Sequence, residues 1–177
     1  MVLYRRNYIA GGTFFFTVAL RDRRSDLLLR QADLLKQAIA EIKAKRPFSI
    51  EAMVVMPEHL HAIWTLPEGD ADYSGRWRAI KSGFVRALTK HGVEVARNAR
   101  GEAEVWQRRF WEHTLRDEND FNRHVDYIHY NPVKHGYVTS PASWPHSSIH
   151  RFIERGVITA DWGANMDFAA DDFGEAL

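Results

Sequence analysis

Residues 48–66 have the sequence FSIEAMVVMPEHLHAIWTL, in which two strand-like runs are joined by a short turn. The run from Phe48 to Met56 is mainly apolar and Pro57-Glu58 favours a turn, so His59 to Leu66 is predicted to return beside it as the second strand of a hairpin. Side chains alternate between the two sides of a strand. His59 and His61 therefore share one side, and the other, core-facing side carries Leu60, Ala62, Trp64 and Leu66.

One more strand and one helix are predicted before the hairpin. Thr13 to Leu20 combines aromatic residues with Thr and Val, a composition typical of a central strand. Gly11-Gly12 interrupts the apolar stretch, which is also too short to span a bilayer, so it is not interpreted as a signal peptide. Ser25 is predicted to cap a helix that ends at Pro47, with apolar residues at helical spacing: Leu28, Ala32, Leu35, Ile39 and Ile42.

Two helices and a strand are predicted after the hairpin. The first helix opens at Ser74 and closes at Gly92, and its apolar face carries Trp77, Ile80, Phe84 and Leu88. A polar loop over residues 92–104 leads to a strand from Val105 to Leu115. The second helix begins at Asp117 and is expected to end near Tyr130, because Asn131-Pro132 disfavours its continuation. A short helix is predicted from Ser148 to Glu154.

The resulting order is β-α-β-β-α-β with an additional C-terminal helix. This order predicts an α+β fold, a ferredoxin-like (RRM-like) sandwich with one antiparallel sheet and two helices on one face. The opposite face of the sheet is expected to be open for function. Because unrelated functions share this architecture, the function has to be inferred from individual residues.

The composition indicates a single globular unit without disulfides. The chain has 177 residues and no Cys, so a cytoplasmic location is expected and a metal would be held by His or by oxygen ligands. Residues 1–155 carry all 24 Lys and Arg but only 18 of the 23 Asp and Glu. A basic domain (1–155) and an acidic tail (156–177) are therefore predicted, and the basic domain favours a polyanionic partner.

His59 and His61 are candidate metal ligands. Two neutral imidazoles on the same side of a strand form the beginning of a metal site. The chain has nine His, however, and an H-x-H pair also arises by chance. The alternative is a pair of surface histidines on a half-exposed strand.

Tyr127 and Asn131 lie four residues apart on the predicted helix and so share a face, while Phe121, Val125 and Ile128 form the stripe that packs on the sheet. A tyrosine beside the histidine pair can attack a phosphorus centre when a divalent cation offsets the charge of the phosphate. Asn131 could complete the ligand set with its amide oxygen. The alternative for Tyr127 is an aromatic ring that only packs in the core.

Basic and aromatic residues are interleaved in three segments, which are Tyr4-Arg5-Arg6, Arg76-Trp77-Arg78 with Lys81, and Trp106 to His113. Cations pair with phosphates and exposed rings stack on unpaired bases, so this pattern favours single-stranded or hairpin nucleic acid. Trp77 is expected to belong to the core instead.

Three motifs in this order resemble one family. They are Pro57-Glu58-His59-Leu60-His61, residues 106–113 (WQRRFWEH) and residues 125–136 (VDYIHYNPVKHG). Together they resemble the REP-associated tyrosine transposases, relatives of the single-tyrosine HUH transposases of insertion sequences. The resemblance extends from Tyr4 to Pro145 and thins out in the acidic tail.

The resemblance implies an HUH endonuclease and strand transferase that acts on single-stranded DNA. It implies that Tyr127 is the nucleophile and that His59 and His61 are metal ligands. Asn131 is implied as the third ligand, at a position where insertion-sequence relatives commonly have Gln. The implied cofactor is Mg²⁺ or Mn²⁺, and the implied reaction forms a 5′-phosphotyrosine intermediate and a free 3′-hydroxyl.

The resemblance also implies the partner, because family members recognise repetitive extragenic palindromes (REP elements) folded as hairpins. The candidates for this contact, chosen by charge and position, are Arg5, Arg6, Arg78, Lys81, Arg108 and Arg109. A cytoplasmic, nucleoid-associated protein is expected, with a monomer favoured over a homodimer. The acidic tail is either a solvated extension or a segment that folds over the basic face and competes with DNA.

Two other functions fit parts of the pattern. A non-catalytic RRM-like module would bind nucleic acid through exposed aromatic residues on its central strands, whereas His59 and His61 occupy the presumed open face here. A relaxase or replication initiator would be a different HUH nuclease. Relaxases usually carry a third His in the metal cluster, and the sequence has no third His in a matching motif.

Overall fold

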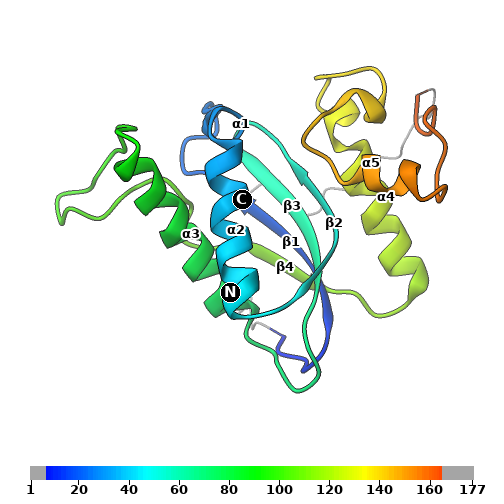
Figure 1. Ribbon diagram of the computed structural model, residues 1–177, viewed down its shortest axis with the longest axis horizontal. Helices are drawn as coiled ribbons and strands as arrows, with labels where there is room; N and C mark the ends of the chain where they lie inside the picture. The colour runs from blue at the N-terminus through cyan, green and yellow to red at the C-terminus, as the bar shows by residue number, and fades with distance from the viewer. Residues whose placement is uncertain (1–6, 165–177) are drawn as a thin grey trace, which may run out of the picture.

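The structure is a computed structural model that describes residues 7–164. Its centre is a four-stranded antiparallel sheet in the order β2-β3-β1-β4 (Figure 1), formed by β1 (Thr13–Ala19), β2 (Ser49–Val55), β3 (His59–Thr65) and β4 (Trp111–Thr114). The predicted α+β fold with an antiparallel sheet is confirmed. Arg5, Arg6 and residues 165–177 of the predicted acidic tail lie outside the described residues.

The predicted hairpin of β2 and β3 is present, and β1 pairs with the other edge of β3. In this register Thr17 lies opposite His61 and Ala19 lies opposite His59. Side chains of β1 alternate between the two faces of the sheet, so Phe14 and Phe16 pack on one face and Phe15 packs on the other. The central strand therefore contributes aromatic rings to two separate cores.

The fourth strand is shorter than predicted. Only Trp111–Thr114 forms a ladder with β1, whereas the predicted strand ran from Val105 to Leu115. Val105 and Phe110 are buried in the core that contains Trp77. A single bridge between Trp106 and Leu20 keeps this segment at the end of β1.

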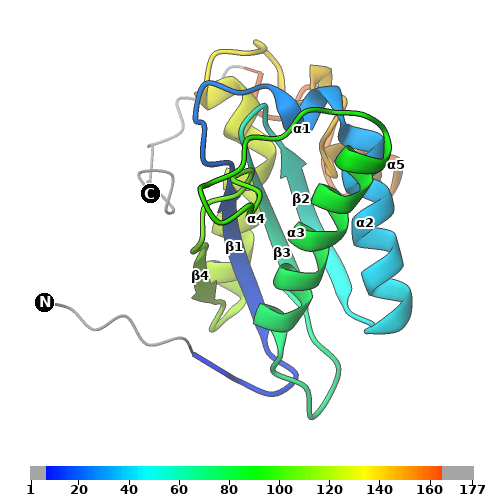
Figure 2. The same cartoon turned by 90° about the vertical axis from the view of Figure 1, so that its left-hand side faces the viewer.

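α2 (Ala32–Lys45) and α3 (Tyr73–Lys90) cover one face of the sheet (Figure 2). The helix predicted from Ser25 is divided into α1 (Leu27–Arg30) and α2, because the backbone breaks at Gln31. The Leu28 N–H donates to the Pro57 carbonyl and holds α1 at the hairpin turn. On α3 the predicted stripe is buried, and Trp77 stacks on Trp64 with ring centroids 4.1 Å apart.

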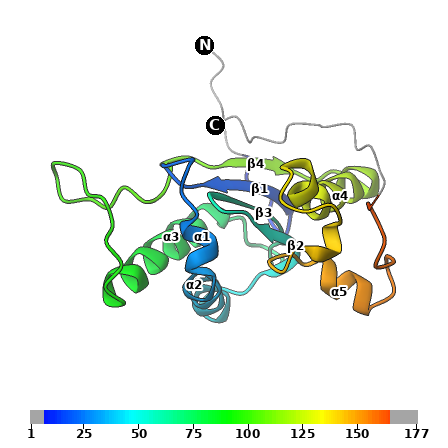
Figure 3. The same cartoon turned by 90° about the horizontal axis from the view of Figure 1, so that it is seen from above.

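α4 (Glu118–Lys134) covers the opposite face of the sheet, which was predicted to be open (Figures 1 and 3). Val125 and Ile128 of its predicted apolar stripe are buried with Phe15 and Ile63 of the sheet. The prediction of an open face is wrong because this stripe has to be removed from water and the second face of the sheet is where it packs. The chain then continues through a 3₁₀ turn (Pro141–Ser143) and α5 (Ile149–Glu154).

α4 continues through Pro132 and ends at Lys134, beyond the end predicted near Tyr130. Proline lacks a backbone N–H but has a φ angle compatible with a helix. The His135 N–H donates to the Asn131 carbonyl at 3.0 Å, and Gly136 ends the helix with a φ of 72°. Asn131 and Lys134 are therefore helical residues on the same side as Tyr127.

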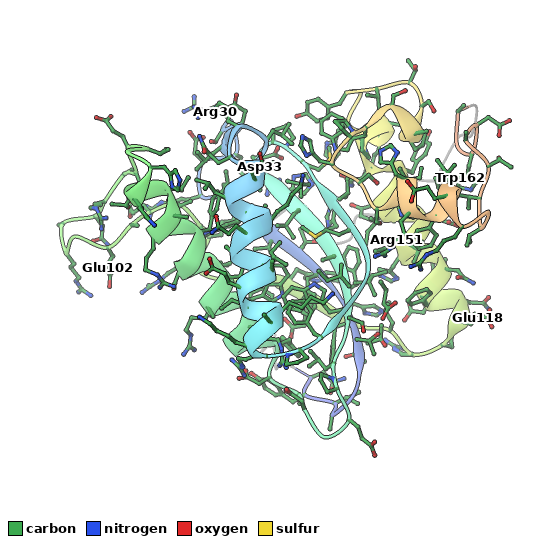
Figure 4. The ribbon with its side chains drawn as sticks, in the orientation of Figure 1. Arg30, Asp33, Glu102, Glu118, Arg151 and Trp162 are labelled. Atoms are coloured by element: carbon green, nitrogen blue, oxygen red, sulfur yellow. The ribbon has the colours of Figure 1, made fainter. Side chains whose placement is uncertain are left out.

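Residues 146–148 lie along the outer edge of β2. The Val55 N–H donates to the His146 carbonyl at 2.9 Å, and the Ser148 N–H donates to the Met53 carbonyl at 2.8 Å. The Ser148 hydroxyl is 2.9 Å from His129 Nε2, which joins α4 to this edge. Figure 4 shows Arg151 on this side of the sheet. Between residues 7 and 164, no helix has both the length and the hydrophobicity needed to cross a membrane.

Candidate functional site

His59 and His61 lie at the start of β3 and point toward α4. Both side chains are fully buried, and their ring centroids are 4.8 Å apart. His59 Nδ1 lies 2.7 Å from a carboxylate oxygen of Glu58, and His61 Nδ1 lies 2.9 Å from Thr17 Oγ1. The alternative of two half-exposed surface histidines is therefore wrong.

Glu58 orients the imidazole of His59. Its carboxylate accepts a hydrogen bond from Nδ1–H, so the lone pair of the ring is on Nε2, which is buried and has no hydrogen-bond partner among residues 7–164. Burial by itself would raise the pKa of Glu58, but the hydrogen bond from His59 and the Arg23 guanidinium at 3.6 Å bring the pKa below its ordinary value. Glu58 is therefore ionised near neutral pH and holds His59 in one tautomer.

α4 places Tyr127 and Asn131 against the histidine pair. The Tyr127 ring contacts the His61 ring with centroids 5.2 Å apart, and His135 at the end of α4 contacts the His59 ring at 5.4 Å. Because Tyr127, Asn131 and His135 follow one another at four-residue intervals, Asn131 lies between the two helix residues that contact the histidines. Tyr127 is 4% exposed and Asn131 is 0% exposed. The structure thus gathers the four predicted residues into one buried cluster.

Four residues of this cluster were not predicted as site residues: Thr17, Glu58, Lys134 and His135. Lys134 Nζ lies 3.2 Å from the Tyr127 hydroxyl and 4.8 Å from the centre of its ring. The signal for Lys134 was its position seven residues after Tyr127, which is two helical turns. Thr17 has no such local signal, because its contact depends on the register between β1 and β3.

A second polar cluster lies at the beginning of α4. Asp120 accepts a hydrogen bond from His113 at 2.9 Å, and the three groups His113, Asp120 and His124 have potential ligand atoms within 4.8 Å of one another, a donor set that suits a divalent cation. The two rings, however, stack at 4.9 Å with only 16° between their planes. Lone pairs lie in the ring plane, so these rings do not aim at a common point. In this arrangement the cluster is a hydrogen-bonded junction between β4 and α4.

Burial and hydrogen bonding shift the pKa values of His124 and Asp120 in this junction. Burial lowers the pKa of His124. Burial alone would raise the pKa of Asp120, but hydrogen bonds from His113 and the Arg116 N–H lower it overall. The junction is therefore built around an ionised carboxylate near neutral pH.

A basic groove of about 760 Å³ lies between α3 and the loop that leads to β4. Five cations and no carboxylate are among the residues that line it, and the cations are Lys81, Arg86, Lys90, Arg97 and Arg108. Lys81 Nζ donates to the Gln107 carbonyl at 2.9 Å and lies 5.8 Å from the centre of the Trp106 ring. Two of the six predicted DNA contacts, Lys81 and Arg108, are therefore brought together here, while Arg78 and Arg109 are exposed elsewhere.

Arg76, which the basic pattern also included, is not available to a ligand. It is 1% exposed, and its guanidinium donates to Asp70 at 2.6 Å and to the Pro47 carbonyl at 2.9 Å. The hydrogen bonds from Arg76 lower the pKa of Asp70 to about 2. Trp77 is buried beside it, as predicted.

The basic groove and the histidine cluster lie on opposite faces of the sheet but at the same end of it. The Gln107 N–H donates to the Ala19 carbonyl at 3.0 Å, and Ala19 pairs with His59 across the ladder of β1 and β3. The groove and the buried cluster are therefore both anchored beside Ala19, at the end of β1.

This combination of sheet, histidine pair and helical tyrosine is that of a transposase. Residues 14–131 match the family model described as "Transposase IS200 like", and the chain belongs to this family. Within it, the chain groups with the REP-associated tyrosine transposases. It is 51% identical over 170 residues to the REP-associated tyrosine transposase of Escherichia coli K12. The matched residues cover 96% of each chain.

Two further relatives agree. A putative REP-associated tyrosine transposase of Haemophilus influenzae is 40% identical over 166 residues, with 93% of this chain and 94% of the relative covered. A solved structure of a REP-associated tyrosine transposase bound to a REP hairpin is 50% identical, covers 97% of this chain and 98% of that chain, and superposes with a TM-score of 0.83. The family and the enzyme class predicted from the three motifs are confirmed.

Proposed function

We propose that this transposase cuts and rejoins single-stranded DNA beside REP-type hairpins, with Tyr127 as the nucleophile and His59, His61 and Asn131 as metal ligands. The observation that carries the proposal is the contact between the Tyr127 and His61 rings inside a buried polar cluster. Burying two imidazoles, an amide and a phenol is unfavourable unless each has a partner or a function. A ring that only fills the core does not need these neighbours.

The residues fit a divalent cation, Mg²⁺ or Mn²⁺. His59 Nε2 is buried and lacks a hydrogen-bond partner in the described part of the chain, while Glu58 occupies Nδ1, which is the arrangement typical of a metal-binding histidine. Two imidazoles suit Mn²⁺ at least as well as Mg²⁺, which prefers oxygen ligands. When bound, the cation supplies charge neutralisation on the phosphate.

The chain's own residues perform the remaining work of cleavage. Tyr127 is held in place by the His61 and Phe15 rings, whose centroids lie 5.2 and 6.1 Å from that of Tyr127. Its hydroxyl oxygen attacks the phosphorus, the bond from phosphorus to the 3′ oxygen breaks, and the 5′ end of the DNA stays on Tyr127. A second 3′-hydroxyl can reverse this step, so strand transfer needs no ATP.

The proposed binding site of the paired stem of the hairpin is the basic groove, because its cations attract phosphates. Lys81 and Arg108 in the groove, and the exposed Arg78 and Arg109, are the proposed phosphate contacts. Arg5 and Arg6 stay candidates from the sequence. The groove and the Tyr127 cluster lie at the same end of the sheet, on opposite faces. We therefore propose that the unpaired strand at the foot of the stem passes from the groove to Tyr127. We propose action as a monomer, because Tyr127 packs against His61 of its own chain. The proposed location is the cytoplasm, on the nucleoid, as expected for a protein that acts on DNA.

The test is a denaturing gel after incubation with a single-stranded REP-type hairpin and Mn²⁺. The wild-type chain is expected to give a covalent protein–DNA band that chelation of the metal prevents. Tyr127→Phe is expected to give no band and to keep the hairpin affinity of the wild type. Tyr130→Phe, three residues along the same helix, is the matched control and is expected to keep the band.

Two outcomes contradict this proposal. Loss of the adduct in Tyr130→Phe with its retention in Tyr127→Phe would assign the nucleophile to Tyr130. Hairpin binding without any adduct in the wild-type chain would favour the non-catalytic nucleic-acid-binding module.

A further inference from the structure

Lys134 is directed at the reacting atom of the proposed nucleophile. Its ammonium group donates a hydrogen bond to the Tyr127 hydroxyl oxygen at 3.2 Å and lies 4.8 Å from the centre of the same ring. Seven residues correspond almost exactly to two turns of helix, so the two side chains are on one side of α4. This alignment exists only because α4 continues past Pro132 to Lys134.

A lysine in the last turn of a helix has an ordinary explanation, because a cation there interacts favourably with the helix dipole, by about 0.3–1 kcal/mol. That interaction requires only a positive charge near the last turn and no particular hydrogen-bond partner. The Lys134 ammonium also has a specific partner, because it donates to the hydroxyl of Tyr127, about two turns back along the helix. Helical side chains lean toward the N-terminus in any case, but the dipole does not account for a hydrogen bond that ends on the phenol oxygen.

We infer that Lys134 is a catalytic residue that stabilises the phenolate of Tyr127 during attack, an inference that rests on the proposed role of Tyr127. The phenol proton passes to water, the bond between the Tyr127 oxygen and phosphorus forms, the bond between phosphorus and the 3′ oxygen breaks, and the 3′ oxygen takes a proton from water. Lys134 stays protonated throughout. In the reverse step the same charge stabilises Tyr127 as the leaving group.

The absence of Cys from the 177-residue chain allows a direct test of the charge. Lys134→Cys removes the ammonium, and alkylation of the single thiol with bromoethylamine restores an ammonium at nearly the same distance. Loss of one preorganised donor typically lowers the catalytic rate by about 100-fold or more, so Lys134→Cys is expected to form the covalent adduct about 100-fold more slowly. Aminoethylation is expected to restore most of the rate, and alkylation with iodoacetamide, which adds a neutral amide, is not.

A second substrate distinguishes whether Lys134 acts on the Tyr127 oxygen or on the leaving 3′ oxygen. A hairpin oligonucleotide with sulfur in place of the bridging 3′ oxygen has a leaving group that needs no stabilisation. If Lys134 acts on Tyr127, the defect of Lys134→Cys persists with this substrate. Disappearance of the defect would assign Lys134 to the leaving oxygen and overturn the inference.

The remaining outcomes are distinct from a failure of the proposed function. A wild-type chain that forms no adduct overturns the proposed function and the inference with it. A wild-type chain that forms the adduct at the same rate as Lys134→Cys overturns the inference alone. Loss of adduct that aminoethylation does not repair, in a variant that still binds the hairpin, also overturns it, because the charge would then not be what Tyr127 requires.

Discussion

The two faces of the sheet are made from the same strands but differ in chemistry. The face under α2 and α3 is built mainly from aromatic and aliphatic side chains, among them Phe16, Trp64 and Trp77. The face under α4 combines a smaller apolar cluster with buried polar groups, which include His59, His61, His124, His129 and Asn131. Alternation along β1 and β3 is what makes this separation possible, because neighbouring residues belong to different faces.

The difference assigns separate physical tasks to the two faces. Burial of apolar surface contributes about 25 cal/mol per Å², so the α2–α3 face stabilises the fold. A buried polar group destabilises the fold unless it is hydrogen-bonded, so the α4 face depends on partners such as Glu58, Thr17, Asp120 and Ser148. The α2–α3 face is therefore expected to dominate stability, and the α4 face to dominate activity and pH dependence.

The largest effect on stability is expected from Trp77→Ala. Its indole is 1% exposed and stacks on Trp64, and truncation of a large buried aromatic side chain destabilises a protein by about 3–5 kcal/mol. Urea unfolding measures the change. Ser82→Ala, at an exposed position of the same helix, is the control and is expected to stay within about 0.5 kcal/mol of the wild type. Equal stabilities of the two variants would remove the distinction between the faces.

A smaller effect is expected on the α4 face when the pH falls. Burial, together with the nearby charges of Arg151 and His150, lowers the pKa of His129 from 6.5 to about 4. A proton therefore binds the unfolded chain more tightly than the folded one, and stability that is complete above pH 6.5 is lost progressively toward pH 4, by up to about 3 kcal/mol.

The measurement is urea unfolding of the wild type and His129→Gln from about pH 3 to about pH 7.5, a range that extends about one unit beyond each of the two pKa values. The wild type is expected to lose stability more steeply than His129→Gln as the pH falls. His91→Gln, at an exposed position, is expected to follow the wild type. Parallel curves for wild type and His129→Gln would show that His129 is not kept neutral by the fold.

Asp120→Asn is expected to lower stability by less than the two preceding changes. It removes the charge at the junction of β4 and α4 while keeping the size of the side chain. The carboxylate accepts from His113 and from the Arg116 N–H, and hydrogen bonds to a charged group contribute about 1.5–3 kcal/mol. Thermal unfolding should therefore begin at a lower temperature than in Glu118→Gln, an exposed neighbour in the first turn of α4. A variant as stable as Glu118→Gln would mean that the junction contributes nothing to the attachment of α4.

The smallest effect is expected for Arg108→Gln and Arg109→Gln, which should leave stability unchanged and weaken hairpin binding. Each cation that contacts a phosphate contributes about one to the slope of log affinity against log salt concentration. The slope should decrease by about that amount in each variant and stay constant in Arg155→Gln, at the end of α5. An unchanged slope for Arg108 or Arg109 would exclude that residue from the DNA contact.

The division of apolar and polar residues between the two faces of the sheet was largely predictable from the sequence, because it depends on the periodicity of single strands and helices. The alternation in β3 placed His59 and His61 opposite Leu60 and Trp64, and the helical spacing of Tyr127 and Asn131 placed them on one side of a helix. These relations need only the geometry of a single strand or a single helix. The function followed from motifs whose order resembles one family.

Features that depend on packing between distant segments could not be predicted. The sequence pattern of α4 showed that it packs on a sheet but not on which face, so the second face was expected to be open. The partner of His61, Thr17, depends on strand register. Lys134 was excluded from the helix because Asn131-Pro132 is a strong breaking signal, and the structure tolerates Pro132 in the last turn.

The edges of the sheet have a consequence for the solubility of the chain. An open edge strand can pair with a strand of another molecule and begin aggregation. Residues 146–148 occupy the backbone groups of β2 at one edge, and β4 at the other edge has only four residues. The segment after α4 thus protects the sheet from intermolecular pairing, and a chain shortened to a point before residue 146 would expose the Val55 N–H and the Met53 carbonyl as a template for self-association.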